Sequence, residues 1–165
     1  MLVLFRPFTK GDFIEGGGVT GSVDEIRLVS TTLTTPDNKL VIVPNSVIYN
    51  DAITNYSAND TRRVDMVFGI GYQDDIDAAQ RVLEDIIAGH ELVLREPEPV
   101  IRLHELGDSS VNFICRPWAR PEDYWTVYWD VTRAVKQRFD GEGISIPFPQ
   151  RDVHIYQQGG GQTPA

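Results

Sequence analysis

The sequence is short of cysteine and of long apolar runs, and each shortage excludes a class of protein. Cys115 is the only cysteine among 165 residues, so the chain forms no internal disulfide and has no thiolate cluster for zinc. It lies in the alternating run 111–115, which indicates a buried structural thiol rather than a nucleophile. No apolar stretch approaches the roughly 20 residues that a membrane-spanning helix needs.

Basic side chains and histidines are also scarce. The chain has 15 Lys and Arg against 24 Asp and Glu, a net charge of -9. Clustered Lys and Arg are what a nucleic-acid phosphate backbone requires, so we predict no nucleic-acid partner. His90, His104 and His154 lack metal-ligand spacing, and no Gly-x-Ser-x-Gly elbow is present. The sequence therefore predicts no catalytic residue, no metal site and no cofactor, and a protein that is not an enzyme.

The first residues are apolar, but only from Met1 to Phe5, and the run stops at Arg6-Pro7. Proline disfavours helix at the residue before it. Taken alone, the pattern is equally typical of an ordinary chain start and of the end of a longer apolar helix.

A β-rich segment follows. Turn residues separate β-branched runs: Gly18–Val23, Ile26–Thr34, Leu40–Val43 and Ala52–Asn55. The three glycines at 16–18 permit positive φ and predict a sharp turn or bulge. A phosphate-binding loop is the alternative, but it would need a following Lys-Ser/Thr and a helix, which this sequence lacks. The sequence at 36–38, Pro-Asp-Asn, predicts another turn.

The second half alternates strands and helices. A strand at Val64–Ile70 precedes a helix that Asp74 or Asp75 caps, with Asp77 complementing its dipole, and that ends at Gly89. Its apolar stripe comprises Ile76, Ala79, Leu83, Ile86 and Ile87.

A hairpin of Val100–Leu106 and Val111–Arg116 comes next, before a helix over about Glu122–Phe139 with a stripe of its own. That stripe comprises Tyr124, Tyr128, Val131, Val135 and Phe139. An extended piece from Ile144 completes the order strand–helix–strand–strand–helix–strand, which is typical of a split βαβ, ferredoxin-like sandwich.

Two features have no clear partner within that sandwich. Trp125 and Trp129 lie beside the apolar stripe of the second helix, where they either complete the core or contact a neighbouring subunit. Asp152–Tyr156 alternates like a strand, and an isolated strand is unstable. We therefore expect it to pair with another chain.

The order of several further motifs is distinctive. They are Phe8–Glu15, Gly71–Asp77, Arg102–Phe113, Val127–Asp130 and Gly143–Gln150. Together with the β-rich segment they resemble the small-conductance mechanosensitive channels, the MscS family, from about Leu2 to Tyr156.

The resemblance implies an α+β fold in which a small Sm-like β-barrel domain precedes a ferredoxin-like α/β sandwich and a C-terminal strand. The implied divisions are residues 1–7 as the end of a pore-lining helix, 8–60 as the β-domain, 61–149 as the α/β domain, 150–157 as an oligomerising strand and 158–165 as a disordered tail. Arg6, Pro7 and Phe8 would form the junction with the pore helix.

The implied function is the cytoplasmic cage of a tension-gated channel that releases ions and small osmolytes on hypoosmotic shock. The implied partners are further copies of the chain, which would form a heptamer. The full-length protein would lie in the bacterial inner membrane through helices that precede this sequence, and the fragment itself would be soluble. The interface would comprise Trp125, Trp129, Asp152, Val153, His154, Ile155 and Tyr156. An Sm-like RNA-binding module and a ligand-binding regulatory domain are the alternatives.

Overall fold

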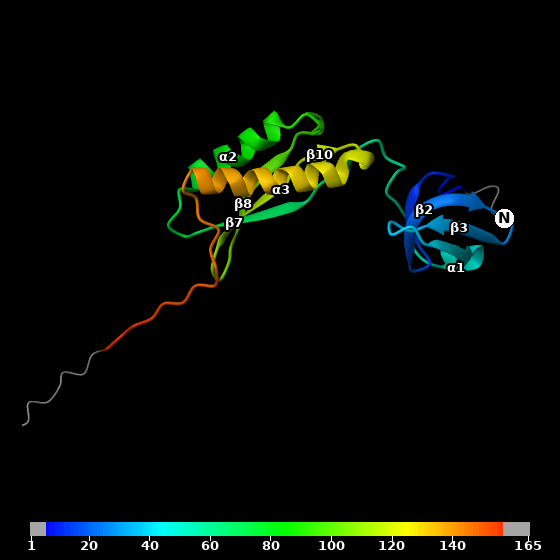
Figure 1. Cartoon of the computed structure of the whole chain (residues 1–165), viewed down its shortest axis with the longest axis horizontal. Helices are drawn as coiled ribbons and strands as arrows, with labels where there is room; N and C mark the ends of the chain where they lie inside the picture. Colours follow the sequence, from blue (N-terminus) through cyan, green and yellow to red (C-terminus); the bar gives the residue numbers. More distant parts are fainter. Residues whose placement is uncertain (1–5, 157–165) are drawn as a thin grey trace, which may run out of the picture.

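The chain folds into two units, each around its own hydrophobic core (Figure 1). The computed structural model describes residues 6–156. We call residues 8–57 the β-unit and residues 62–146 the α/β-unit, and a short linker joins them. The predicted pore-helix end at 1–5 and the predicted disordered tail at 158–165 lie outside the described residues.

The β-unit is a five-stranded antiparallel sheet in the order β4-β3-β2-β1-β5, with helix α1 packed against it. Its elements are β1 (Phe13–Gly16), β2 (Val19–Ile26), β3 (Ser30–Thr34), β4 (Leu40–Pro44), α1 (Asn45–Asn50) and β5 (Thr54–Asn55). Its core consists of six buried apolar side chains from the entering segment, the strands and α1: Phe8, Ile14, Val23, Leu33, Val43 and Ile48.

The predicted glycine turn is confirmed. Gly17 and Gly18 have φ of 60° and 74° and join β1 to β2 as a two-residue hairpin loop. Only glycine adopts two successive positive φ values at little cost. A Cβ on Gly17 would also lie 3.1 Å from a methyl of Val47, so this turn lets α1 approach the sheet closely.

One prediction for the β-unit is wrong, and one of its elements was missed. Ile26–Thr34 is not one strand, because a sharp turn at residues 27–29 divides it into the end of β2 and all of β3. Helix α1 was not predicted, since its six residues are too short to show helical periodicity. Both errors involve one residue, Asn45, whose contacts are described below.

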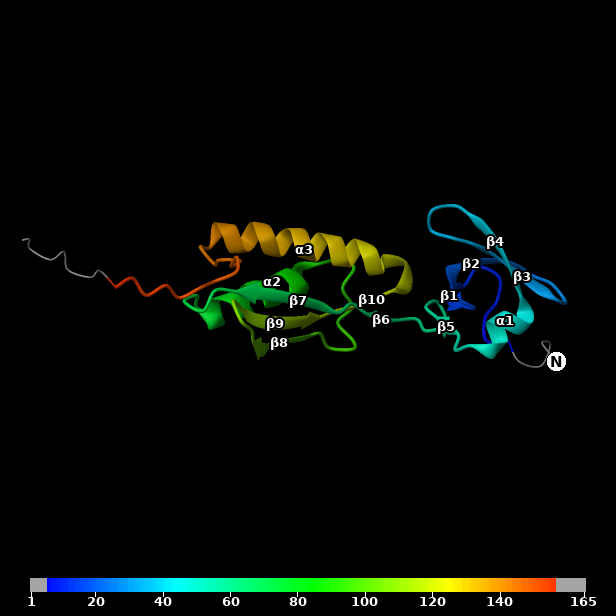
Figure 2. The ribbon, with the colours of Figure 1, turned by 90° about the horizontal axis from the view of Figure 1, so that it is seen from below.

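The α/β-unit has both of its long helices on one face of a three-stranded antiparallel sheet, β7-β9-β8 (Figure 2). Its elements are β6 (Arg62–Arg63), β7 (Met66–Ile70), α2 (Ile76–Gly89), β8 (Val100–Leu106), β9 (Val111–Arg116), β10 (Trp118–Ala119), the 3-10 turn η1 (Pro121–Asp123) and α3 (Tyr124–Gly141). β6 and β10 form a separate two-stranded ladder beside the linker. Mixed α+β architecture with antiparallel sheets is the predicted fold class, which is confirmed.

Helix α2 begins and ends where the sequence indicates. The side chain of Asp75 accepts hydrogen bonds from the backbone N–H groups of Asp77 and Ala78, at 2.9 and 3.0 Å. The predicted apolar stripes need two changes on α2 and one on α3. Ile76 is exposed rather than buried, while Val82 on α2 and Val127 on α3 are core residues that the prediction omitted.

The predicted sixth element of the sandwich is not a strand. Ile144 is buried in the core, but residues 144–147 make only one backbone hydrogen bond to the segment after β7, from Gly71 N to Ser145 O at 3.3 Å. Pro147 and Pro149 have no N–H to donate, which prevents a regular ladder. Residues 152–156 are extended and exposed and form no strand within this chain, so their pairing with another chain stays a prediction.

Candidate functional site

The two units meet through a stack of three side chains. The guanidinium of Arg62, at the start of the α/β-unit, lies 4.5 Å from the ring centroid of Tyr56 and 3.8 Å from that of Tyr124. Tyr56 follows β5, and Tyr124 is the first residue of α3. Both distances are well within the range of cation–π attraction. We call these residues the Tyr56–Arg62–Tyr124 stack.

The β-unit holds its side of this stack firmly. The Tyr56 backbone N–H donates to Phe13 O at 2.9 Å, its hydroxyl donates to Glu15 Oε2 at 2.9 Å, and its ring packs on Phe13. The hydrogen bond to Glu15 raises the pKa of Tyr56, and burial adds to the effect. Tyr56 therefore presents a neutral, fixed ring face to Arg62.

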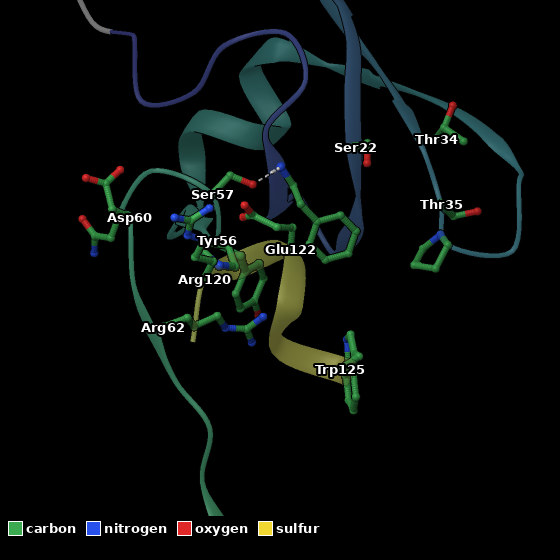
Figure 3. Close-up of a pocket in the computed structure, with 14 residues that line it drawn as sticks. Ser22, Thr34, Thr35, Tyr56, Ser57, Asp60, Arg62, Arg120, Glu122 and Trp125 are labelled. Atoms are coloured by element: carbon green, nitrogen blue, oxygen red, sulfur yellow. Dashed lines mark hydrogen bonds between the residues drawn. The ribbon is translucent and has the colours of Figure 1, made fainter. Parts of the chain in front are cut away.

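A crevice of about 840 Å³ opens beside the stack, between the two units (Figure 3). Ser22, Thr34 and Pro36 line it from the β-unit, and Trp125 stands opposite on α3. Its charged lining residues are two acids and two bases: Asp60, Glu122, Arg62 and Arg120. These formal charges sum to zero, and the lining gives the ligand-binding alternative no specific support.

The predicted junction residues lie where the described chain enters the β-unit. Phe8 is buried in the core and stacks on Tyr49, with ring centroids 6.3 Å apart. The carbonyl of Pro7 accepts a hydrogen bond from Asn55 Nδ2 at 3.1 Å, while Arg6 is exposed. The entering segment is thus anchored to β5 and α1 from its second described residue. Coupling to a pore helix stays a prediction.

Asn45 fixes the turn between β2 and β3, a feature that the sequence analysis missed. Its side-chain Nδ2 donates to the carbonyls of Arg27 and Leu28 at 2.9 and 3.1 Å, and its backbone N–H donates to Val29 O at 2.9 Å. Its Oδ1 accepts the hydroxyl of buried Thr31 at 2.7 Å. Three consecutive carbonyls are therefore satisfied by one residue, and the turn presents Leu28 and Val29 outward.

Trp125 and Trp129 form an exposed aromatic ridge on α3. They are 53% and 62% exposed and stack on each other, with centroids 5.8 Å apart and ring planes 28° apart. Val127 and Val131, on the opposite side of the helix, are fully buried. The two tryptophans therefore lie outside the core of this chain, and their predicted interface role is untested.

The acids at the start of α2 have structural roles. Asp74 Oδ2 accepts hydrogen bonds from the N–H groups of Gly71 and Ser145 and from the Ser145 hydroxyl, at 2.7 to 2.9 Å. Asp74 thus fastens the segment after α3 to the end of β7, and Asp75 caps α2. Among residues 6–156, no group of three or more His, Cys, Asp or Glu side chains is arranged to hold a metal ion.

Cys115 and His90 are engaged in the fold, whereas the other two histidines are exposed. Cys115 is buried, and burial raises the pKa of its thiol to about 12. His90 accepts a hydrogen bond from Leu92 N at Nδ1, and its Nε2 lies 3.2 Å from Asp130 Oδ2. His104 and His154 are exposed. No helix within the described range combines the length and apolarity needed to cross a bilayer.

Comparisons with known proteins agree along almost the whole chain. Residues 1–58 match the family model described as "Mechanosensitive ion channel, beta-domain", and residues 64–146 match "Mechanosensitive ion channel MscS, C-terminal". A small-conductance mechanosensitive channel of Edwardsiella ictaluri is 46% identical over 95% of this chain, and one of Helicobacter pylori is 33% identical over 96%. This chain spans 55% and 58% of the lengths of those two proteins.

Solved structures give the same result. The closed-state crystal structure of Helicobacter pylori MscS matches 95% of this chain with a TM-score of 0.87 and 33% identity, and the match covers 62% of that protein chain. The cryo-EM structure of Arabidopsis thaliana MSL1 matches 89% of this chain with a TM-score of 0.73 at 22% identity, covering 55% of that protein chain. The second likeness concerns the fold alone.

Proposed function

The chain belongs to the MscS family of mechanosensitive channels, and from this premise we propose that it forms the cytoplasmic cage of a channel that bilayer tension opens. The observation that carries the proposal is the match to the closed Helicobacter pylori channel over 95% of the chain. In this role the chain transmits ions and small osmolytes passively during hypoosmotic shock. Its relatives are channels rather than enzymes, which is consistent with the absence of covalent chemistry.

We also propose that the chain assembles with copies of itself, as a heptamer. Two unpartnered surfaces support assembly: the Trp125–Trp129 ridge and the C-terminal segment, where Val153, Ile155 and Tyr156 are exposed. A large apolar surface in a soluble unit is typical of an interface. A third such surface, which the sequence analysis did not single out, is the outer face of the edge strand β4, with Leu40 and Ile42.

The place at which the chain enters the β-unit supports a position directly under the membrane. Pro7 ends any preceding helix, and Phe8 is already part of the core. A helix ending at Arg6 would therefore stand directly on the β-unit. We accordingly propose that the full-length protein lies in the bacterial inner membrane, with the two units on its cytoplasmic side.

The test is survival of hypoosmotic shock. The full-length reading frame that contains this chain would be expressed in cells that lack their own mechanosensitive channels, which would then be diluted abruptly from high to low osmolarity. We expect survival well above the empty-vector control and tension-activated currents in excised patches. Membrane expression with neither rescue nor currents would contradict the proposed function.

A further inference from the structure

The turn between β2 and β3 exposes two apolar side chains. Leu28 is 87% exposed and Val29 is 73% exposed, and Leu28 is the most exposed large apolar side chain of the β-unit. They are the two central residues of the hairpin turn, which a hydrogen bond from Arg27 N to Ser30 O closes at 2.8 Å. Exposed leucine and valine at a convex tip make no contribution to the core and need another explanation.

The carbonyl groups of this turn are paired within the protein. In contact with lipid, an unpaired carbonyl costs several kcal/mol because no water is present to satisfy it. The carbonyls of Arg27, Leu28 and Val29 all accept hydrogen bonds from Asn45, which is only 3% exposed. The tip therefore presents apolar side chains while its carbonyls remain paired inside the protein.

The turn lies at the end of the β-unit that is remote from the α/β-unit, as both ribbon views show (Figures 1 and 2). The β3–β4 turn of the same sheet, at Pro36, lines the crevice beside Trp125. The β2–β3 and β3–β4 hairpins thus point in opposite directions, and the β2–β3 turn, with its two exposed apolar side chains, is the one of this pair that faces away from the α/β-unit.

Exposed basic side chains lie near the turn, among acids. Arg27 pairs with Glu25 at 2.7 Å, and both side chains are exposed. Lys10 also acts on Glu25, whose pKa is lowered chiefly by Arg27 and to a smaller degree by Lys10. Arg6 is exposed too, and the acid nearest the entering segment, Asp12, accepts a hydrogen bond from the same Asn55 amide that bonds Pro7 O. Basic residues beside an apolar tip are typical of contact with anionic lipid headgroups.

We propose that the β2–β3 turn contacts the lipid bilayer, with Leu28 and Val29 in the interfacial layer and Arg27 and Lys10 among the headgroups. The inference rests on the proposed function, which places the β-unit under a membrane. A lipid surface fits better than a protein partner because the apolar feature is a two-residue convex tip flanked by charge. The full-length protein would thereby sense the membrane through its β-unit as well as through its helices.

The test uses a fluorescent label at the turn. Cys115 is buried and its thiol pKa is raised, so it stays unlabelled, and Leu28→Cys accepts an environment-sensitive dye. The 165-residue chain, carrying an N-terminal histidine tag, would be tethered to phosphatidylcholine–phosphatidylglycerol vesicles that contain nickel-chelating lipid. The matched control is the same dye at Asp37→Cys, an exposed position on the opposite hairpin turn.

We expect a blue-shifted emission at position 28 and loss of that emission with brominated lipids, and neither change at position 37. An unchanged dye at position 28, with flotation showing the chain on the vesicles, would overturn the proposal. A blue shift that appears in concentrated protein without vesicles would also overturn the proposal, because a second copy of the chain would then cover the turn. Neither outcome bears on survival of hypoosmotic shock, which tests the channel function separately.

Discussion

Replacing Asn45 with alanine should destabilise the β-unit much more than most single substitutions do. The change removes three side-chain hydrogen bonds, to the Thr31 hydroxyl and to the carbonyls of Arg27 and Leu28. Thr31 is fully buried, so its hydroxyl loses a partner that water cannot replace. A buried unsatisfied group costs about 1–3 kcal/mol. The carbonyls lie at an exposed turn and recover part of their bonding from water, so we expect a total loss of about 2–4 kcal/mol.

Urea unfolding followed by far-ultraviolet circular dichroism would measure this loss. The three tryptophans all lie in the α/β-unit, so their fluorescence reports that unit separately. The matched control is Asn50→Ala, an exposed asparagine at the other end of α1, for which we expect a change below about 0.5 kcal/mol.

A double substitution tests whether the loss comes from the Asn45–Thr31 hydrogen bond. In Asn45→Ala with Thr31→Val, no buried hydroxyl remains without a partner, so the pair should cost less than the sum of the two single changes. If Asn45→Ala alone shifted the free energy of unfolding by less than about 0.5 kcal/mol, or if the two changes were additive, the role assigned to Asn45 would be wrong.

Three further predictions concern the junction, assembly and gating. Arg62→Ala removes two cation–π contacts of about 0.5–1 kcal/mol each. Small-angle scattering should then show an altered distance between the two units, while each unit keeps its own unfolding transition. For Arg62→Lys, which keeps the charge but lacks the planar guanidinium, the distance should lie between those of the wild type and Arg62→Ala. Truncation from Gln150 onward should reduce the oligomer mass in light scattering, and an unchanged mass would contradict assembly through Asp152–Tyr156. In the full-length channel, Pro7→Ala should alter closure or inactivation in patch recordings, and wild-type gating at every tension would exclude coupling through Pro7.

The last prediction concerns the ion preference of the full-length channel. The net charge of -9 per chain favours cations near any narrow opening that acids line, and screening over about 8 Å limits the effect to such openings. We expect weak selectivity with no strong anion preference, fading as salt rises. Reversal potentials in asymmetric KCl would measure it, and a clear anion preference at low salt would show that the acids face outward.

The sequence predicted best those elements whose own residues determine them. The hairpin of Val100–Leu106 and Val111–Arg116 was predicted with its observed limits, because alternation and the Gly-Asp-Ser-Ser turn are local signals. Of the two predicted caps, Asp74 and Asp75, Asp75 is the one that caps α2, and the predicted stop at Gly89 is correct for the same reason. Local chemistry specifies these features wherever the rest of the chain lies.

The features that were missed depend on distant residues. Arg27, Leu28 and Val29 have ordinary strand propensity, and what turns the chain there is Asn45, at the far end of two intervening strands. The Tyr56–Arg62–Tyr124 stack joins a residue after β5 to one at the start of α3, and no periodicity predicts such a meeting. The sequence did not decide whether Trp125 and Trp129 are buried in the core or exposed. Two adjacent apolar stripes on one helix look alike in the sequence, and only the elements that pack against the helix decide which stripe is buried.

The Tyr56–Arg62–Tyr124 stack determines which relative motions of the two units are easy. Cation–π attraction depends strongly on the height of the cation above a ring and only weakly on rotation of that ring about the axis to the cation. Pulling the units apart therefore opposes both contacts at once, whereas twisting one unit against the other opposes neither strongly. The junction should therefore resist separation of the two units more than it resists rotation of one unit about the axis through the stack.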